Sequence, residues 1–427
     1  MPNFGGRTSV RRRCDEQIYE RLTCKTRILK KRILIALLGV ALLSQIPFAY
    51  RRYRLSRLRN AIQELEAQRV AANETEYVDY QGVIHVHTFL GGHSTGTFAE
   101  LIAAAKTNAL DFVIMTEHPQ SQFNTAAMTL NGSFGGVLFV NGNEVVTANG
   151  DRLLLIPGSD NANGATSQST DDVIAKQKSS GGLSIAAYPT ESRHWQTAAV
   201  DGIELYNLFV NARQKSKLAL FFDGVWSYRS NANLMFANFF ERPSDTLKLW
   251  DETISTTNRR LIATAGNDAH SNIGLSINDA SGKQWLGVKL DPYERSFHTV
   301  RTHVLIRKDK PLSRESLLEA LLQGHCYISF DLFADAKGFT FTAANTGKLL
   351  GDEVAFQNGL QLKVSSPLSS RIVLFRNGNV TDQKIGTQVE FLVPSSSAAY
   401  RVECYLDSLP APAKGKPWII SNPIYVR

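Results

Sequence analysis

The chain of 427 residues is 43% hydrophobic and 20% charged, an ordinary globular composition with room for two or three domains. Its formal net charge is +8, but residues 1–60 hold 15 Lys and Arg against three acidic residues, whereas the rest holds 32 basic against 36 acidic residues. Because the excess of basic residues is confined to one end, the net charge does not indicate a nucleic-acid-binding surface. We expect no nucleic-acid partner.

A basic segment, residues 1–32, precedes the apolar run ILIALLGVALLSQIPFAY, residues 33–50, which contains no ionised side chain. As a helix this run would be about 27 Å long, which matches the core of a bilayer. Basic clusters on both sides could contact lipid headgroups. We expect an uncleaved single-pass anchor with the larger part of the chain on the extracytoplasmic (periplasmic) side. A cleaved signal peptide and a buried soluble helix are the competing interpretations.

Residues 51–77 are predicted to form a helical stalk. Apolar side chains recur there with 3-4-3 spacing at Leu55, Leu58, Ile62 and Leu65. Two heptads are too few for a coiled coil, so we expect a short stalk capable of weak self-association.

From residue 78 to residue 335, short β-branched runs alternate with helical patterns. The strand candidates include GVIHVHT, DFVIMTEH, GVLFVNGNEVV, RLLLIPG, GLSIAAYP, GIELYN and LIATAGNDAH, and the helix candidates include TFAELIAAAKTNA, DDVIAKQKSS and TLKLWDETISTTNRR. Repeated βα units predict an α/β fold in which helices cover parallel strands. In an α/β barrel the functional residues sit at the carboxyl ends of the strands.

An aromatic insertion, residues 205–245, interrupts this alternation. Extra helices on the barrel, an apolar wall of the substrate pocket and a membrane-facing surface are the three interpretations that the sequence leaves open.

The last part of the chain, residues 336–427, changes character. Its strand candidates are parted by Gly, Asn and Pro turns, which predicts a small C-terminal β-sandwich. A helix through SRESLLEALLQGH links it to the barrel. Cys326 and Cys404 fall far apart in this half, and the sequence does not decide whether they pair.

Histidines and carboxylates gather at the ends of the predicted strands. The stretch GVIHVHTFLGGHSTGT carries three of the nine histidines of the chain within nine positions. Residues i and i+2 of a strand face the same side, so His85 and His87 should point together. Imidazole and carboxylate ligands from separate strands form a rigid site for zinc, manganese or iron. The candidate ligands are His85, His87, His93, His118, Glu144, Asp268 and His270.

In these motifs the sequence resembles the PHP (polymerase and histidinol phosphatase) family. The family's HxH motif with a third ligand six residues later is matched by His85, His87 and His93. Its second motif corresponds to TEH, its bridging glutamate to Glu144, and its Asp-x-His motif to GNDAH. The resemblance covers residues 78–330, and ALLQGHCYISFD with WIISNPIYV resembles a branch that carries a small C-terminal β-domain, as in carbaryl-hydrolase-like members.

The resemblance implies a distorted (β/α)7 barrel that holds two or three metal ions and hydrolyses phosphoesters, although some relatives cleave carbamates or esters. It implies one metal site from His85, His87, Glu144 and Asp268. It implies a second site from His93, His118 and His270. Asp268 and His270 would thereby serve catalysis as well as metal binding.

The sequence departs from the family pattern at Tyr188, where AAYP replaces a histidine before proline. A phenol must lose a proton to bind a metal and is a weaker ligand than imidazole, so we expect two ions rather than three. The Tyr188 hydroxyl would then be free to contact the substrate or a water. His194 could contact an anionic substrate, and Glu204 is expected to support a ligand rather than bind metal itself.

The expected activity is hydrolysis by a metal-activated water, because a divalent ion lowers the pKa of bound water from 15.7 to about 7. No nucleophile elbow and no P-loop lysine is present in the sequence. We therefore expect a membrane-anchored metal-dependent hydrolase that acts on a small molecule, with a phosphoester as the first substrate class. A carbamate, ester or amide hydrolase and a non-catalytic envelope-binding module are the alternatives. The sequence leaves the metal and the oligomeric state open.

Overall fold

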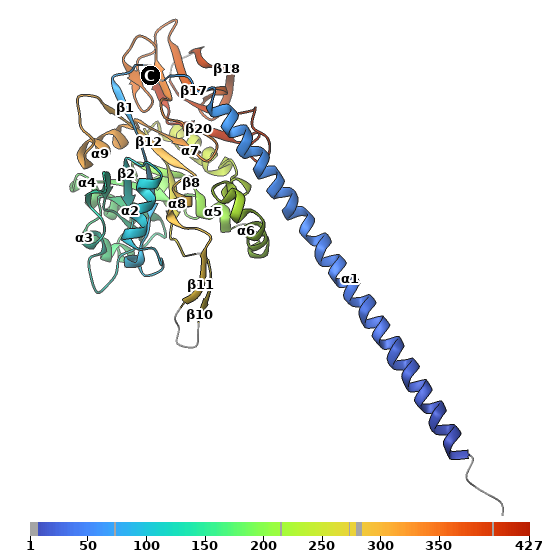
Figure 1. Ribbon diagram of the computed structural model, residues 1–427. Coiled ribbons are helices and arrows are strands. Elements are labelled where there is room, and N and C mark those ends of the chain that lie inside the picture. Colours follow the sequence, from blue (N-terminus) through green and yellow to red (C-terminus); the bar gives the residue numbers. More distant parts are fainter. Residues whose placement is uncertain (1–6, 72–73, 214–215, 273, 279–283, 395–396) are drawn as a thin grey trace, which may run out of the picture. The chain divides into compact units, whose positions relative to one another are not determined.

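The structure is a computed structural model of the chain, and it separates into two units, Met1–Tyr53 and Arg54–Arg427. The residues it describes are 7–71, 74–213, 216–272, 274–278, 284–394 and 397–427 (Figure 1). The first six residues of the predicted basic segment therefore lie outside the described part.

Helix α1, Arg7–Glu66, contains the predicted anchor. Within it, Lys25–Glu66 is the one stretch of the described chain long and apolar enough to cross a membrane, and an 18-residue window of it has a mean hydropathy of 2.1. The apolar side chains of residues 33–46 are exposed, as in Leu34 at 56% and Leu42 at 71%. Length, composition and exposure agree with an anchor, and membrane crossing itself stays a prediction.

The stalk residues that follow the anchor do not form a free helix surface. Leu55 and Leu58 are 0% exposed and Leu65 is 6% exposed, and all three belong to the core of the second unit, with Ile62 packed against it. The prediction of a self-associating stalk is therefore wrong for residues 54–66, because the same apolar stripe is already buried within the chain.

The second unit has a mixed α/β fold, as the sequence predicted. Strand β1 pairs in parallel with β2 and β9, and the parallel pairs β2–β4, β7–β8 and β8–β9 continue the sheet. Strand β6 runs antiparallel to both β5 and β7. A bridge between Glu117 and Asn143 joins the β2 side to β5, and the sheet closes on itself. These strands are β1 Tyr77–Val86, β2 Phe112–Met115, β4 Val137–Val140, β5 Asn143–Val146, β6 Arg152–Ile156, β7 Leu183–Ala187, β8 Gly202–Asn207 and β9 Ile262–Ala269.

Several helices of this unit begin at a residue whose side chain caps the first turn. Thr97 and Glu100 form a capping box at the start of α2, and the Ser169 hydroxyl caps α4. The helices and 3-10 turns are η1 Phe89–Gly91, α2 Phe98–Thr107, α3 Thr125–Met128, η2 Asp160–Ser167, α4 Thr170–Ser179, η3 His194–Gln196, α7 Ser244–Thr257, α8 Tyr293–Ser296 and α9 Arg314–Gln323.

The aromatic insertion consists of helices. It contains α5 Leu208–Arg213, α6 Lys217–Asn231 and η4 Ala232–Asn238. Just after them, Phe240 packs against Phe330 and Phe333, with ring centroids 4.0 Å and 5.4 Å away. Phe209, near its start, lies 5.8 Å from the His270 ring. Phe240 therefore serves packing, and Phe209 reaches the predicted site.

The C-terminal strands continue the barrel sheet. Strand β12 pairs with β1, β13 pairs with β12, and β13 pairs in turn with β20, all antiparallel. Thus hydrogen bonds run without a break from the barrel into residues 336–427, and the domain boundary at 335 stays a prediction. The remaining strands are β3 Gly132–Phe134, β10 Gly274–Asn278, β11 Gln284–Lys289, β12 Arg301–Arg307, β13 Cys326–Ser329, β14 Thr340–Ala343, β15 Lys348–Leu349, β16 Glu353–Val354, β17 Gln361–Arg376, β18 Asn379–Leu392, β19 Ala398–Tyr405, β20 Pro417–Ser421 and β21 Ile424–Val426.

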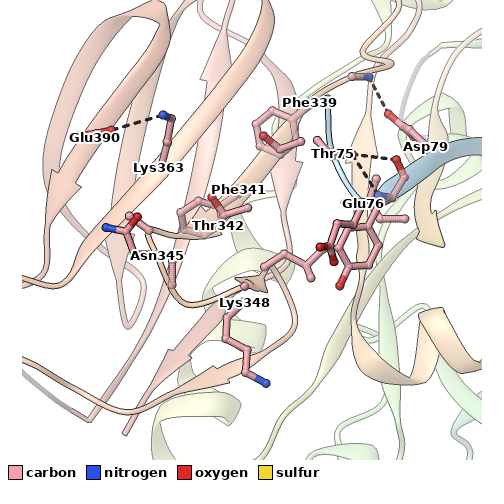
Figure 2. A pocket seen from close by; sticks show the side chains of 18 of the residues that line it. Thr75, Glu76, Asp79, Phe339, Phe341, Thr342, Asn345, Lys348, Lys363 and Glu390 are labelled. Carbon is pink, nitrogen blue, oxygen red and sulfur yellow. Dashed lines mark hydrogen bonds and ion pairs between the residues drawn. The ribbon is translucent and has the colours of Figure 1, made fainter. Parts of the chain in front are cut away.

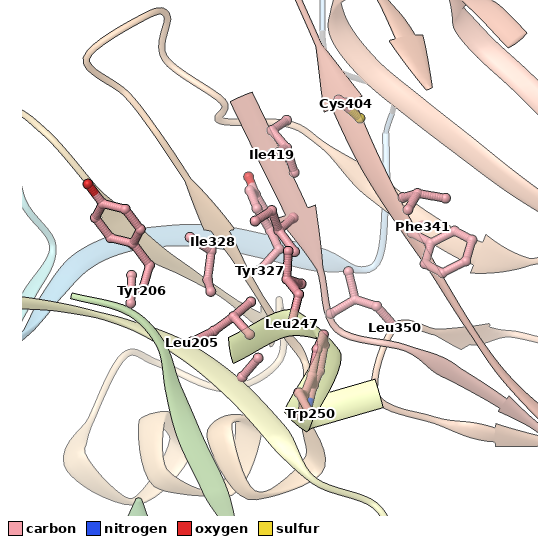
Figure 3. Close-up of a cluster of buried hydrophobic side chains, with 14 of the residues drawn as sticks. Leu205, Tyr206, Leu247, Trp250, Tyr327, Ile328, Phe341, Leu350, Cys404 and Ile419 are labelled. Atoms are coloured by element: carbon pink, nitrogen blue, oxygen red, sulfur yellow. The ribbon is translucent and has the colours of Figure 1, made fainter. Parts of the chain in front are cut away.

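One hydrophobic core is shared by the α/β part and the C-terminal strands (Figure 3). Trp250 of α7, Tyr327 of β13 and Ile419 of β20 all have 0% exposure within it. Cys326 and Cys404 are both buried and both free. Because the apolar cluster spans both parts, we expect them to fold together rather than separately.

Candidate metal centre

The structure brings all seven predicted ligands to one edge of the closed sheet. His85 lies in β1, Glu144 in β5 and Asp268 in β9, while the other histidines follow strand ends. The rings of His87, His93, His118 and His270 lie 4.4–5.3 Å apart in the pairs that contact one another. Residues far apart in the sequence therefore form one cluster, as expected of the carboxyl ends of parallel strands.

Local backbone geometry aims these side chains inward. The register of β1 shifts between Ile84 and Val86, and His85 has a φ of 70°. Asp268 and Tyr188 also have positive φ, 48° in each case. Non-glycine residues rarely adopt this region, and such bulges and left-handed residues cluster at functional sites.

Glu144 occupies the middle of the cluster. Its Oε2 lies 3.1 Å from His85 Nε2, 3.2 Å from His87 Nε2 and 3.4 Å from His118 Nε2. Glu144 is only 2% exposed. Three ring nitrogens around a single carboxylate oxygen suit a bridging ligand.

His93 and His270 form the second part of the cluster. Their Nε2 atoms lie 2.6 Å apart. His270 Nδ1 donates a hydrogen bond to the Asp268 carbonyl oxygen at 2.8 Å, which leaves its Nε2 as the metal-binding lone pair. Two such nitrogens face each other stably only when a proton or another cation is shared between them.

Several polar atoms of the cluster have no hydrogen-bond partner among the described residues. These atoms are both ring nitrogens of His87 and Oδ1 of Asp268. An unpaired polar group in the interior is costly, on the order of 1–3 kcal/mol each. Metal coordination would satisfy Asp268 Oδ1 and one ring nitrogen of His87, so the residues fit a divalent ion.

By distance alone, the ligand atoms fall into two groups that could each hold an ion. One group is His85, His87 and Glu144, and the other is His87, His93 and His270. By distance His87 belongs to both groups, whereas the resemblance implies His87 for the first site and His118 for the second. His118 lies near both parts, 3.4 Å from Glu144 Oε2 and 4.4 Å from His93 between ring centroids, and the assignment of each ligand to one ion stays a prediction.

Glu204 lies behind His85. Its Oε1 accepts a hydrogen bond from His85 Nδ1 at 2.5 Å, and its Oε2 accepts one from the Asn207 amide at 2.9 Å. A carboxylate on the far ring nitrogen fixes the tautomer and the orientation of a metal-binding histidine. Glu204 therefore supports His85 from the side opposite the cluster.

Asp268 and Tyr188 are linked directly. The Tyr188 hydroxyl donates a hydrogen bond to Asp268 Oδ2, and Asp268 Oδ1 points toward the imidazoles. Burial, and then the charge of Asp268, raise the pKa of Tyr188 far above that of an ordinary phenol. Tyr188 is thus a neutral donor to a candidate ligand.

The electrostatics of the cluster favour a cation. Burial alone would lower the pKa of His85, but the carboxylates of Glu204, Asp268 and Glu144 outweigh burial and raise it well above its ordinary value. Burial alone would raise the pKa values of Glu144 and Asp268, but the nearby imidazoles outweigh burial and lower both. Burial lowers the pKa of His87 to about 3, so its ring stays neutral and able to bind metal. The carboxylates of the cluster are therefore anionic, and a bound cation would stabilise them.

Glu117, the carboxylate of the TEH motif, is buried and hydrogen-bonded to Thr88. It accepts hydrogen bonds from the Thr88 amide at 3.0 Å and the Thr88 hydroxyl at 2.6 Å. Glu117 thereby holds the segment that follows β1, which carries His87 and His93.

His194 lies next to helix α4, where its Nε2 is 3.5 Å from Asp171 Oδ2. Its contact with a substrate stays a prediction. The cation that contacts the cluster is instead Arg152, which the sequence analysis did not single out. Its Nη1 lies 3.4 Å from Glu144 Oε1, and its guanidinium carbon lies 5.0 Å from the centre of the Tyr188 ring.

A third group could hold a metal by distance, His303, Asp331 and Asp335. Arg301 already lies 3.1 Å from the Asp331 carboxylate, and His303 Nδ1 lies 2.8 Å from Asp79 Oδ1. Two positive side chains among these carboxylates make an internal ion-pair network the better interpretation.

Figure 2 shows a second feature, a cavity with a volume of about 560 Å³. Its lining includes Tyr77, Phe341, Asn345 and Lys348, and none of the seven candidate ligands. Since size alone is no sign of chemistry, the imidazole cluster remains the candidate active site.

No protein-family model and no curated protein matches the chain. Among solved structures, it is similar to a two-domain protein containing a predicted PHP-like metal-dependent phosphoesterase from Bacteroides vulgatus, with 14% identity, a TM-score of 0.35 and coverage of 83% of this chain and 98% of the other. PsfC from Pseudomonas syringae matches with 14% identity, a TM-score of 0.38 and coverage of 59% and 92%. The lesion-specific endonuclease PfuEndoQ from Pyrococcus furiosus matches with 14% identity, a TM-score of 0.33 and coverage of 57% and 56%. Similarity at this level does not say what the chain does.

Proposed function

We propose that this protein is a PHP-family metal-dependent hydrolase, that it acts on phosphoesters, and that its N-terminal helix anchors it in a membrane. The observation that carries the proposal is the buried cluster of imidazoles around Glu144 and Asp268, whose unpaired polar atoms need a cation. The resemblance of the HxH, TEH and GNDAH motifs supports the family.

A divalent ion in this cluster supplies Lewis acidity and lowers the pKa of a water that it binds. The carboxylates of Glu144 and Asp268 would hold the ions, together with His85, His87, His93, His118 and His270. Glu204 keeps the Nε2 lone pair of His85 directed into the centre. Tyr188 donates to Asp268 Oδ2 and fixes that carboxylate, so that Oδ1 remains directed at the ions.

We propose two ions rather than three. The Tyr188 hydroxyl is protonated in its buried position and donates to Asp268, so it takes the place of a histidine ligand without binding metal. The ligand atoms fall into two neighbouring groups that share His87, and a neutral imidazole has one lone pair, so His87 would serve one of two neighbouring ions. Manganese, zinc and iron all accept this ligand set.

The test is turnover by the purified full-length protein in detergent. We expect hydrolysis of an aryl phosphate to disappear after treatment with a chelator and to return when manganese, zinc or iron(II) is added. Aryl acetate and aryl carbamate, assayed in parallel, test the alternative hydrolase on the same site. Metal binding without turnover of any of these substrates would favour the non-catalytic module and contradict the proposal.

A further inference from the structure

Arg152 owes its position to the one strand that runs against its neighbours. It is the first residue of β6, and the sheet register pairs it with Val146 of β5 and Ala187 of β7. Because β5 and β7 run in the opposite direction, the start of β6 lies at the edge where they end. Glu144 lies two residues before Val146 in β5, and Tyr188 directly follows the last residue of β7.

The Arg152 guanidinium has spare hydrogen-bonding capacity. It carries five N–H donors in a planar fork. Among the residues that the structure describes, it makes one hydrogen bond, the 3.4 Å contact to Glu144, and a longer ion pair of 3.9 Å with Glu191. The Arg152 side chain is 40% exposed, whereas Glu144 is buried. The fork thus borders the buried centre and remains accessible to a solute.

The negative charge of Glu144 does not by itself explain why an arginine lies beside the centre. Two divalent ions bound to the ligands of the centre would already outweigh the charges of the three carboxylates Glu144, Asp268 and Glu204. Arg152 adds a further positive charge at the rim, where charge repulsion would destabilise the loaded centre. An anionic ligand that reaches both the ions and the guanidinium removes this excess.

We propose that Arg152 forms an anion subsite beside the metal centre and that the substrate is a phosphomonoester, two of whose terminal oxygens it binds. This inference rests on the proposed hydrolase function and narrows its substrate class. A planar fork matches the spacing of phosphoryl oxygens, which a lysine ammonium does not. A monoester carries about two negative charges at neutral pH, because its second pKa is about 6. A phosphodiester carries one charge, and carbamates and carboxylic esters carry none, so the subsite favours the monoester.

The direct test is binding of inorganic phosphate to the metal-loaded, full-length protein, followed by calorimetry. We expect Arg152→Met to weaken phosphate binding by about 10- to 100-fold, the usual effect of losing a charge-assisted hydrogen-bonded pair. Arg152→Lys should recover part of the loss. Glu191→Gln, which removes the competing carboxylate at 3.9 Å, should tighten binding. Arg307→Met is the matched control, since Arg307 is exposed and pairs with Glu76 and Asp309 instead.

Metal content is measured for each variant, because Arg152 contacts Glu144. With two ions retained, Arg152→Met should lower kcat/KM for an aryl phosphomonoester about 10- to 100-fold and lower it less for the matching phosphodiester. Phosphate binding that is equal in the wild type and in Arg152→Met would overturn the subsite.

The two proposals fail in different ways. If the protein hydrolyses neutral esters or carbamates, and Arg152→Met does so at the wild-type rate, the subsite is disproved and the metal-dependent hydrolase is kept. Phosphate binding that depends on Arg152 without turnover of any substrate would keep the subsite and disprove the hydrolase.

Discussion

Asp268 serves two partners at once, one with each carboxylate oxygen. Oδ2 accepts from Tyr188 and Oδ1 faces His85, His87 and His270. A change of charge at this residue should therefore affect the ions more than the fold.

We expect Asp268→Asn to reduce turnover by about 1,000-fold or more, since the amide keeps the shape of the side chain but loses the anionic ligand. Metal analysis should show a weakened ion, and thermal unfolding of the variant should stay close to the wild type. Asp309→Asn, an exposed substitution beside Arg307, is the control. A folded Asp268→Asn protein with normal turnover would disprove the assignment.

Tyr188 gives a second residue-level prediction, on metal stoichiometry. Because the protonated phenol donates to a ligand and does not itself coordinate, Tyr188→Phe should leave two ions per chain and weaken catalysis. Tyr188→His restores an imidazole and should raise the bound metal toward three. Elemental analysis of the purified proteins decides both. Loss of one ion in Tyr188→Phe would show that the tyrosine is a ligand.

At the scale of elements, a buried ion-pair network ties β1 to β12 and β13. His303 is 0% exposed and lies between Asp79 and Asp331, while Tyr327 donates to Asp79 and Arg301 pairs with Asp331. Burial alone would lower the pKa of His303, but the two carboxylates raise it to about 10. The imidazolium therefore belongs to the folded state at neutral pH.

This network predicts how stability depends on pH. A histidine whose pKa is raised on folding stabilises the protein fully below its unfolded pKa, about 6.5, and this contribution is lost as pH rises toward 10. Between pH 6 and pH 9 we expect the free energy of unfolding to fall by on the order of 3 kcal/mol more in the wild type than in His303→Asn. Chemical denaturation across this range measures the difference. Parallel pH profiles in the two proteins would show that His303 is neutral when folded.

The burial of Leu55, Leu58 and Leu65 predicts where a soluble fragment should begin. A fragment starting at Arg54 keeps these side chains in the core, whereas one starting at Glu76 removes all three. Each buried leucine contributes about 2–5 kcal/mol, so the shorter fragment should unfold at lower denaturant concentration or aggregate. Equal midpoints for the two fragments would show that the helix adds nothing to the fold.

The sequence predicted the parts of this centre that follow from strand ends. His85, His87, Glu144 and Asp268 terminate or follow apolar strands, and such residues meet when the strands are parallel. Arg152 could not be found in this way, because it begins a strand, and only the reversed direction of β6 brings it to the same edge. A single reversed strand leaves no mark in an apolar run such as RLLLIPG.

The stalk shows a second limit of sequence reasoning. A 3-4-3 apolar stripe has the same appearance whether it meets another chain or the core of its own chain. Leu55 and Leu58 follow the predicted periodicity, yet their partner is a tertiary surface that forms only when distant segments fold. The helix was predictable from local pattern, and its partner was not.

At the scale of the whole molecule, the apolar helix predicts attachment to a membrane. We expect the full-length protein to sediment with membranes and to remain there in high salt and at alkaline pH, whereas a fragment beginning at Arg54 stays in solution. An 18-residue apolar run has no charge for salt to screen, so only detergent should release it. Release by salt alone, or a mature chain that begins after residue 50, would contradict the anchor.

The hairpin between β5 and β6 also bears on how such a protein can diversify. The turn closes through a hydrogen bond that the Thr147 amide donates to the Asp151 carbonyl oxygen. It holds none of the seven candidate ligands, which lie on or after β1, β2, β5 and β9. Residues between Val146 and Arg152 could therefore be substituted during evolution, and the substrate could change, without any change in the metal ligands. The turn and the metal ligands would be under separate selection. A change of substrate would then not require an ancestral protein that had lost its metal site.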